Sequence, residues 1–207
     1  MALTRARAPG LAAVVGVPAL AAAVLLGAGC ATRVDGPPGV VAPAEPAQTA
    51  LRENDAPFRH KDHIITPLAR FEVTGRVLGT RRYLVDREAR LVPVDVALGW
   101  GPMSDTAVLR DLRFTQMARA FMWAADELPI EREDIERHAA NMHPIPADGA
   151  VSRAIGRLRP GQVVTLRGVL VQVDAPDGWE WTSSLSREDT GTGACELVWV
   201  ESVAVVR

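Results

Sequence analysis

The chain of 207 residues carries 23 Lys and Arg against 25 Asp and Glu, so its formal net charge at neutral pH is −2. A balance this even excludes the excess of positive charge that nucleic-acid-binding domains use to contact phosphates. Two cysteines in the whole chain exclude a fold that depends on several disulfides.

The first 29 residues are predicted to be a signal peptide. Arg5 and Arg7 provide a positive start, and residues 11–28 contain no charged side chain. Small residues stand directly before Cys30, and this pattern resembles the cleavage site of bacterial lipoproteins, although the leucine of that pattern stands one position early, at Leu26. The resemblance implies a lipid on Cys30. The alternative is an uncleaved membrane anchor, because 18 apolar residues reach the lower limit of a membrane-spanning length.

Both alternatives leave the rest of the chain outside the cytoplasm. We therefore expect a protein of the bacterial cell envelope that faces the periplasm and is held to a membrane by acyl chains on Cys30. Ala31 follows Cys30, and resemblance to lipoproteins of Gram-negative bacteria then implies the outer membrane. Lipidation would leave Cys195 as the second cysteine, which we expect to be a small, buried strand residue without a disulfide.

Residues 30–56 are rich in Ala and Pro and show no hydrophobic period. Such a composition predicts an extended tether that would hold a domain away from the membrane. Residues 57–207 are then predicted to form a single globular domain, which is long enough to bury a core.

Within that domain, strands are predicted at 69–85 and 91–98, followed by a short helix that Ser104 or Asp105 caps. Residues 114–125 fit either a helix or a strand. A helix is predicted over 131–140, and a second over 150–158 with Asp148 as its cap.

The remaining pattern is that of strands, at 162–173, 179–183 and 195–206, with Gly168 as a bend or bulge. Because strands precede and follow the helices without regular alternation, we expect an α+β fold. It would be a small antiparallel bent sheet or an OB-like barrel, with two or three short helices inserted between strands. The glycine-containing segments 75–78 and 168–171 resemble the bent strands of OB-type barrels.

Three stretches, 95–105, 138–148 and 179–200, together resemble a family of small, uncharacterised bacterial envelope proteins. The resemblance covers most of the predicted domain. It implies no activity, cofactor or catalytic residue.

Trp100, Trp179 and Trp181 are the candidate binding residues. Trp179 and Trp181 stand two positions apart, so both rings lie on one face if the segment is a strand. Paired indoles on a polar strand stack on sugar rings or grip a peptide, and they also serve to cover a core.

His138, His143 and Asp148 are the candidate catalytic or metal-binding residues, and Asn141 stands between the histidines as a second polar binding residue. The alternative is structural: His138 complements the end of a helix, while Asn141 and His143 hydrogen-bond a proline-rich loop. No third ligand stands at a standard spacing, so we expect no metal and no cofactor.

Two further motifs are assigned ordinary structural roles. Residues 60–63, His-Lys-Asp-His, are expected to form an exposed start of the domain. Residues 189–191, Asp-Thr-Gly, match the aspartic-protease triplet but are expected to form a turn.

The sequence thus predicts a lipid-anchored periplasmic module that binds an envelope protein, peptidoglycan or another saccharide, and no nucleic acid. The alternative is a membrane-tethered hydrolase that uses His138, His143 and Asp148, with or without a metal.

Overall fold

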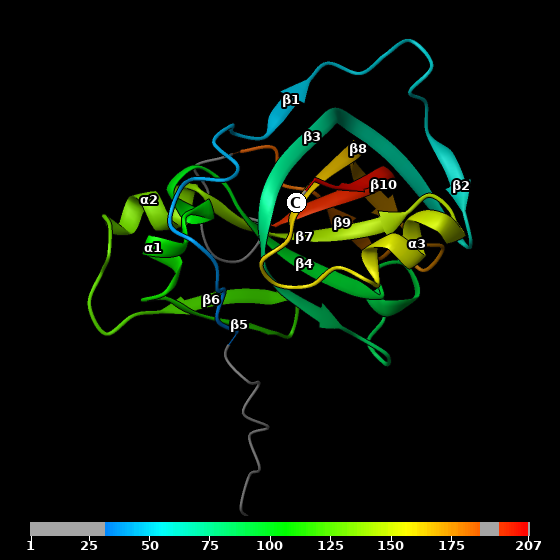
Figure 1. Ribbon diagram of the computed structural model, residues 1–207. Coiled ribbons are helices and arrows are strands. Elements are labelled where there is room, and N and C mark those ends of the chain that lie inside the picture. Colours follow the sequence, from blue (N-terminus) through cyan, green and yellow to red (C-terminus); the bar gives the residue numbers. More distant parts are fainter. Residues whose placement is uncertain (1–31, 187–194, 207) are drawn as a thin grey trace, which may run out of the picture.

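The structure is a computed structural model that describes residues 32–186 and 195–206 (Figure 1). Its strands are β1 (Ala47–Thr49), β2 (Phe58–His60), β3 (His63–Arg82), β4 (Val94–Gly99), β5 (Arg113–Met117), β6 (Ala120–Ala124), β7 (Ala139–Pro146), β8 (Val163–Asp174), β9 (Glu180–Thr182) and β10 (Glu196–Val205). The helices are all short: η1 (Glu88–Arg90), η2 (Gly101–Ser104), α1 (Thr106–Leu109), α2 (Arg132–Arg137) and α3 (Gly149–Ile155).

Five strands pair in a closed circuit, in the order β3-β4-β7-β10-β8 and back to β3. The α+β class predicted from the sequence is confirmed, and the sheet is bent. The prediction of a purely antiparallel sheet is wrong, because β7 and β10 run parallel. The physical reason is that neighbouring directions cannot alternate around a ring with an odd number of strands, so at least one pair must be parallel.

The long strand β3 closes the circuit by pairing with two strands in succession. Its residues 64–76 pair with β8, and its residues 76–82 pair with β4. The register shifts near Pro67 and again near Val77, which lets the strand bend from one partner to the other. Gly168 of β8 faces a third shift, which lies in β10 between Val200 and Ser202. The bend or bulge predicted at Gly168 therefore lies in the opposite strand β10, whereas the pairing of Gly168 with β3 is regular, which corrects that prediction.

The main hydrophobic core lies inside the circuit. All five strands contribute alternate residues to it, and Val151 and Ile155 of α3 pack against it. Two further clusters lie on the outside. One packs Leu78 and Ala97 against β5, α1 and α2, and the other packs β7, β8 and β10 against the 83–93 connection and the segment around β9. The chain thus covers much of its own outer surface.

The short elements correct several predictions. The ambiguous segment 114–125 is a β-hairpin, β5–β6. The predicted helix 131–140 ends at Arg137, because residues 139–146 pair with β4 and β10 and become β7. Both predicted caps are confirmed. Asp105 accepts a hydrogen bond from the N–H of Ala107, and Asp148 accepts from the N–H groups of Ala150 and Val151.

The residues predicted to form a tether contact the domain instead. Val34 and Ala42 are almost fully buried, and β1 pairs with β3. The Ser104 hydroxyl accepts hydrogen bonds from the N–H groups of Val41 and Ala42. Their backbone groups find partners that composition alone cannot reveal. In the described part of the chain, no helix has the length and apolar character needed to cross a membrane.

Candidate functional site

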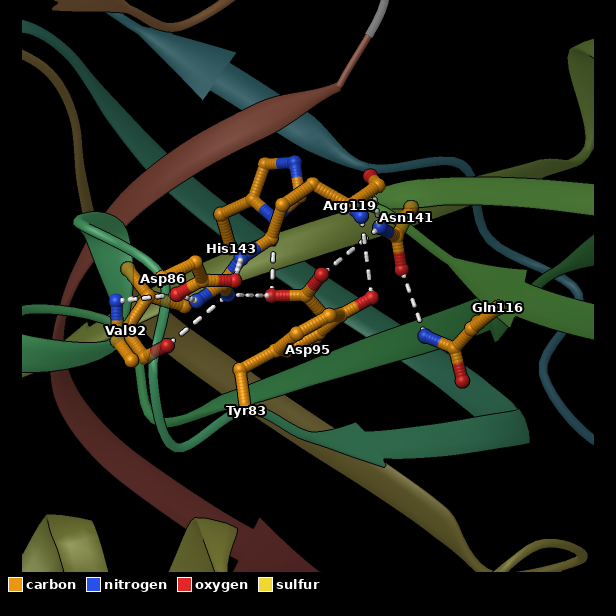
Figure 2. A network of polar contacts seen from close by, with 9 residues as sticks. Tyr83, Asp86, Val92, Asp95, Gln116, Arg119, Asn141 and His143 are labelled. Atoms are coloured by element: carbon orange, nitrogen blue, oxygen red, sulfur yellow. Dashed lines mark hydrogen bonds and ion pairs between the residues drawn. The ribbon is translucent and has the colours of Figure 1, made fainter. Parts of the chain in front are cut away.

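A cluster of polar side chains lies between the closed circuit of five strands, which we call the barrel, and the β5–β6 hairpin (Figure 2). Asp95 of β4 is fully buried, and His143 of β7 is only 3% exposed. The Nδ1 atom of His143 lies 3.0 Å from the Oδ1 atom of Asp95, within ion-pair distance but without the alignment of a hydrogen bond. A buried carboxylate is costly unless other groups compensate its charge.

Arg119 supplies that compensation from the tip of the hairpin. Its Nη1 donates to Oδ1 of Asp95 at 2.6 Å and to the carbonyl of Val92 at 2.9 Å. Its Nε and Nη2 form a fork on the Asp86 carboxylate, at 3.0 and 2.7 Å. The guanidinium carbon also lies 3.8 Å from the centre of the Tyr83 ring. The hydrogen bonds from Arg119 hold the pKa of Asp86 below its ordinary value.

The backbone of the hairpin turn is strained where Arg119 stands. Ala118 and Arg119 both have positive φ, 49° and 66°. Two left-handed residues suit a two-residue hairpin turn, but glycine and asparagine adopt them at lower cost than alanine or arginine. Such strain persists where the surroundings determine the conformation strongly, and the contacts of Arg119 supply that determination.

Asn141 completes the cluster. Its Nδ2 donates to the backbone carbonyl of Arg119 at 3.0 Å and more weakly to Asp95 at 3.4 Å, while its Oδ1 accepts from Nε2 of Gln116 at 2.8 Å. The cluster therefore joins three parts of the chain: the barrel strands β4 and β7, the hairpin, and the 83–93 connection. These contacts hold the hairpin against the barrel, and we call the cluster of Asp86, Asp95, Arg119 and Asn141 the latch.

Trp179 and Trp181 lie beside this cluster, and their ring centres are 5.9 Å apart. The prediction that the two rings share a face is confirmed. Trp181 also contacts the ring of His143 at 4.9 Å, and Trp179 lies 6.3 Å from the ring of His63. The Arg87 guanidinium stands over Trp179 at 4.6 Å. Both indoles remain half-buried, so each keeps a part of its surface in solvent.

Trp100 does not belong to this surface. It is 2% exposed and packs in the main core, so its prediction as a binding residue is wrong. The reason is tertiary: Trp100 directly follows a strand whose two faces are both covered. His63, expected in an exposed segment, is instead 8% exposed at the first position of β3. Burial lowers the pKa of His63.

The structure does not bring His138, His143 and Asp148 together as one site. His138 closes α2, with its Nδ1 2.7 Å from the carbonyl oxygen of Asp134, which matches the structural alternative. Asp148 caps α3. Asn141 and His143 lie within strand β7 and not in a loop, which corrects that part of the alternative.

Other predicted features have these positions. Cys195 directly precedes β10 and is half-buried, where a buried strand residue was expected. Cys30 and residues 189–191 lie outside the described residues. In residues 32–186 and 195–206, no group of three or more His, Cys, Asp or Glu side chains is arranged to hold a metal ion.

Comparison with known proteins adds no relative. No family model matches the chain. No curated protein and no solved structure matches it either.

The sequence interpretation missed Asp95, Arg119 and Asp86. A signal for Asp95 was present, because it is a charged residue within the apolar run Val94–Gly99. A charge in such a strand indicates a buried partner. No comparable signal identifies Arg119, because its role depends on a turn 24 residues away from Asp95.

Proposed function

We propose that this protein is a lipid-anchored binding module of the bacterial cell envelope, built on an OB-type barrel, with Trp179 and Trp181 as its recognition surface. The closed circuit supports the barrel type. Numbered along the chain, the five strands β3, β4, β7, β8 and β10 pair in the order 1-2-3-5-4, with a single parallel pair. OB barrels are five-stranded Greek-key barrels that use one sheet face and two connecting loops to bind oligonucleotides and oligosaccharides.

The two connections that carry ligand contacts in such barrels are the first and the fourth. Here they are residues 83–93, which contain Arg87, and residues 175–195, which contain Trp179 and Trp181. The strand face that OB domains use is formed here by β4 and β7, and the hairpin with Arg119 covers it. The surface that remains exposed for a ligand is therefore the pair of indoles, Trp179 and Trp181, with Arg87 beside them. The meeting of these side chains from the first and fourth connections is the observation that carries the proposal.

The chemistry of this surface suits a ligand with a flat apolar face and a polar edge. Indole rings bury a large area at a small entropic cost and retain a polar N–H. Arg87 and Asp177 form an exposed ion pair at the margin, at 2.5 Å. Saccharides of the envelope, such as peptidoglycan fragments, combine these properties, and an apolar peptide segment of a partner protein is the other ligand of this kind.

The test is a titration of the detergent-solubilised full chain with soluble peptidoglycan fragments, followed by tryptophan fluorescence and by the melting temperature. The double variant Trp179→Ala/Trp181→Ala is expected to lose the response. Arg87→Ala, which removes the cation from Trp179, is expected to weaken binding by roughly 2- to 5-fold. Arg132→Ala is the matched control, because Arg132 makes the same kind of contact with Trp123, in a different cluster.

Two results would count against the proposal. One is a variant pair, Arg87→Ala and Arg132→Ala, with equal effects on the titration. The other is a double tryptophan variant that melts normally and still binds the fragments as the native chain does. A native chain that ignores saccharides but retains a protein in crosslinking experiments would move the ligand class to a peptide.

The alternative function, a membrane-tethered hydrolase using His138, His143 and Asp148, gains no support from the geometry of the described residues. Its three groups have separate local partners. The His143 imidazole lies beneath Trp181 and is almost fully buried, so a substrate has no direct access to it in this structure.

A further inference from the structure

The first described residues are held firmly on the β5–β6 hairpin. Thr32 and Phe114 exchange two backbone hydrogen bonds, at 2.9 and 3.3 Å, across the outer edge of β5. Val34 is 1% exposed and packs in the cluster beneath the hairpin. The carbonyl of Asp35 accepts from Nη2 of Arg76 at 2.9 Å. Figure 1 shows this blue segment reaching the hairpin at the lower side of the molecule.

This attachment fixes the distance between the domain and its proposed anchor. Only Ala31 separates Cys30 from Thr32. Two trans peptide units span at most about 8 Å between Cα atoms, so a lipid on Cys30 would begin beside β5. An uncleaved anchor ending at residue 28 would leave four residue steps, at most about 15 Å.

The hairpin turns an exposed face outward at this place. Phe114, Phe121 and Trp123 point inward to the cluster beneath it. Gln116 also points inward, where it donates to Asn141. Strand alternation turns the residues between these four outward. Met117 and Met122 are 51% and 40% exposed, and Ala120 and Ala124 are exposed as well. The outward face consists of Arg113, Thr115, Met117, Ala120, Met122 and Ala124.

The charge on this face is neutralised within the molecule. Arg113 stands at one end of the face and forms two hydrogen bonds with the carboxylate of Asp126, at 3.0 and 2.8 Å. The middle of the face carries methyl, thioether and hydroxyl groups. Methionine side chains are flexible and adapt to irregular apolar surroundings.

We propose that the outward face of the β5–β6 hairpin rests on the lipid bilayer, so that the domain is held flush against the membrane and not on a tether. This inference depends on the membrane anchor of the proposed function and is independent of the Trp179 and Trp181 surface. A face this close to its anchor meets the bilayer at the high effective concentration of a short linker, so even a weak apolar affinity orients the domain. Because only Ala31 separates the proposed lipid on Cys30 from the hairpin, the occupant proposed for this face is the bilayer and not a second copy of the chain.

The test is photo-crosslinking in vesicles of phosphatidylethanolamine and phosphatidylglycerol that contain only the purified full chain, with its N-terminus processed as cells process it. Benzoylphenylalanine replaces Met122 in one sample and Ala150, an exposed residue of α3 outside the hairpin, in the control. We expect phospholipid adducts at position 122 in excess of those at position 150 by on the order of tenfold, given the short linker.

Three results would overturn the inference. Equal phospholipid adducts at the two positions would show that the hairpin face is not held on the bilayer. A dimer adduct at position 122 would assign the face to a second copy of the chain. A chain that does not associate with the vesicles would remove the anchor itself, and that failure is read separately by flotation before illumination. A native melting temperature for both samples shows that the substitutions leave the fold intact.

Discussion

Arg119→Met is the substitution that tests the latch most directly. The Asp95 carboxylate is fully buried, and its closest cationic contact is the Arg119 guanidinium, at 2.6 Å. Removing one partner of a buried ion pair leaves an uncompensated charge and costs about 3–5 kcal/mol. Methionine keeps the unbranched apolar stem of arginine but not the guanidinium, so the loss reports mainly on the charge and its hydrogen bonds. We expect the free energy of unfolding to fall by that amount at neutral pH.

The assay is urea unfolding followed by tryptophan fluorescence. A shift of the unfolding midpoint is converted to a change in the free energy of unfolding when the dependence of that free energy on urea concentration, the m value, is unchanged. The matched control is Arg167→Met, because Arg167 forms a similar two-bond contact with Glu72 but both side chains are about half exposed. Exposed pairs contribute about 0–1 kcal/mol, so this control is expected to change little. The double variant Arg119→Met/Asp95→Asn removes both charges and should be more stable than Arg119→Met alone.

The same variants give an acid-dependent readout. The hydrogen bonds from Arg119 lower the pKa of Asp86 in the folded protein. Stability from this group is therefore present above its unfolded pKa of about 3.9 and is lost as the pH falls through the lower folded value. Arg119→Met should reduce that loss.

The reasoning is refuted if Arg119→Met lowers the free energy of unfolding no more than Arg167→Met does, because the buried Asp95 carboxylate would then not depend on the guanidinium.

Three further outcomes are expected from the same unfolding assay. Ala118→Gly should stabilise the protein by about 0.5–1 kcal/mol, because Ala118 has a φ of 49° that glycine adopts without a Cβ penalty, and a destabilised variant would contradict the strained turn. Gly168→Ala should destabilise it by more than about 3 kcal/mol, because an added Cβ would lie 1.9 Å from the carbonyl oxygen of Trp199, and near-native stability would refute that close approach. Burial lowers the folded pKa of His63, so the unfolded state binds the proton first and stability should fall as the pH drops below about 6.5. His63→Gln should flatten this slope between neutral and mildly acid pH, and an unchanged slope would assign it to other groups such as His60, whose pKa burial also lowers.

The features that the sequence predicted correctly are those decided by neighbours along the chain. Asp105 and Asp148 each stand just before a short helix and cap it through N–H groups two or three residues away. Strand β8 follows from its dense β-branched residues, and the shared face of Trp179 and Trp181 follows from the two-residue period of a strand. These conclusions need no knowledge of distant segments.

The predictions that were wrong concern segments whose hydrogen-bond partners lie far away in the sequence. Residues 139–140 were predicted as helix, but pairing with β4 makes them a strand. The Pro-rich start was predicted as a tether, but Ser104 and β5 supply partners for its backbone. Composition describes what a segment can do alone, and tertiary hydrogen bonds override it.

The sequence by itself determined the α+β class, the helix caps and the paired indoles. The export and lipidation signal at Cys30 stays a prediction. The tertiary structure alone decided the closed circuit with its parallel pair, the burial of Trp100, and the latch of Asp95, Arg119, Asp86 and Asn141. The physical reason is the separation along the chain of the residues that interact. A cap or a strand period is set within a few residues, whereas ring closure and burial of a charge require segments that meet only after the whole chain has folded.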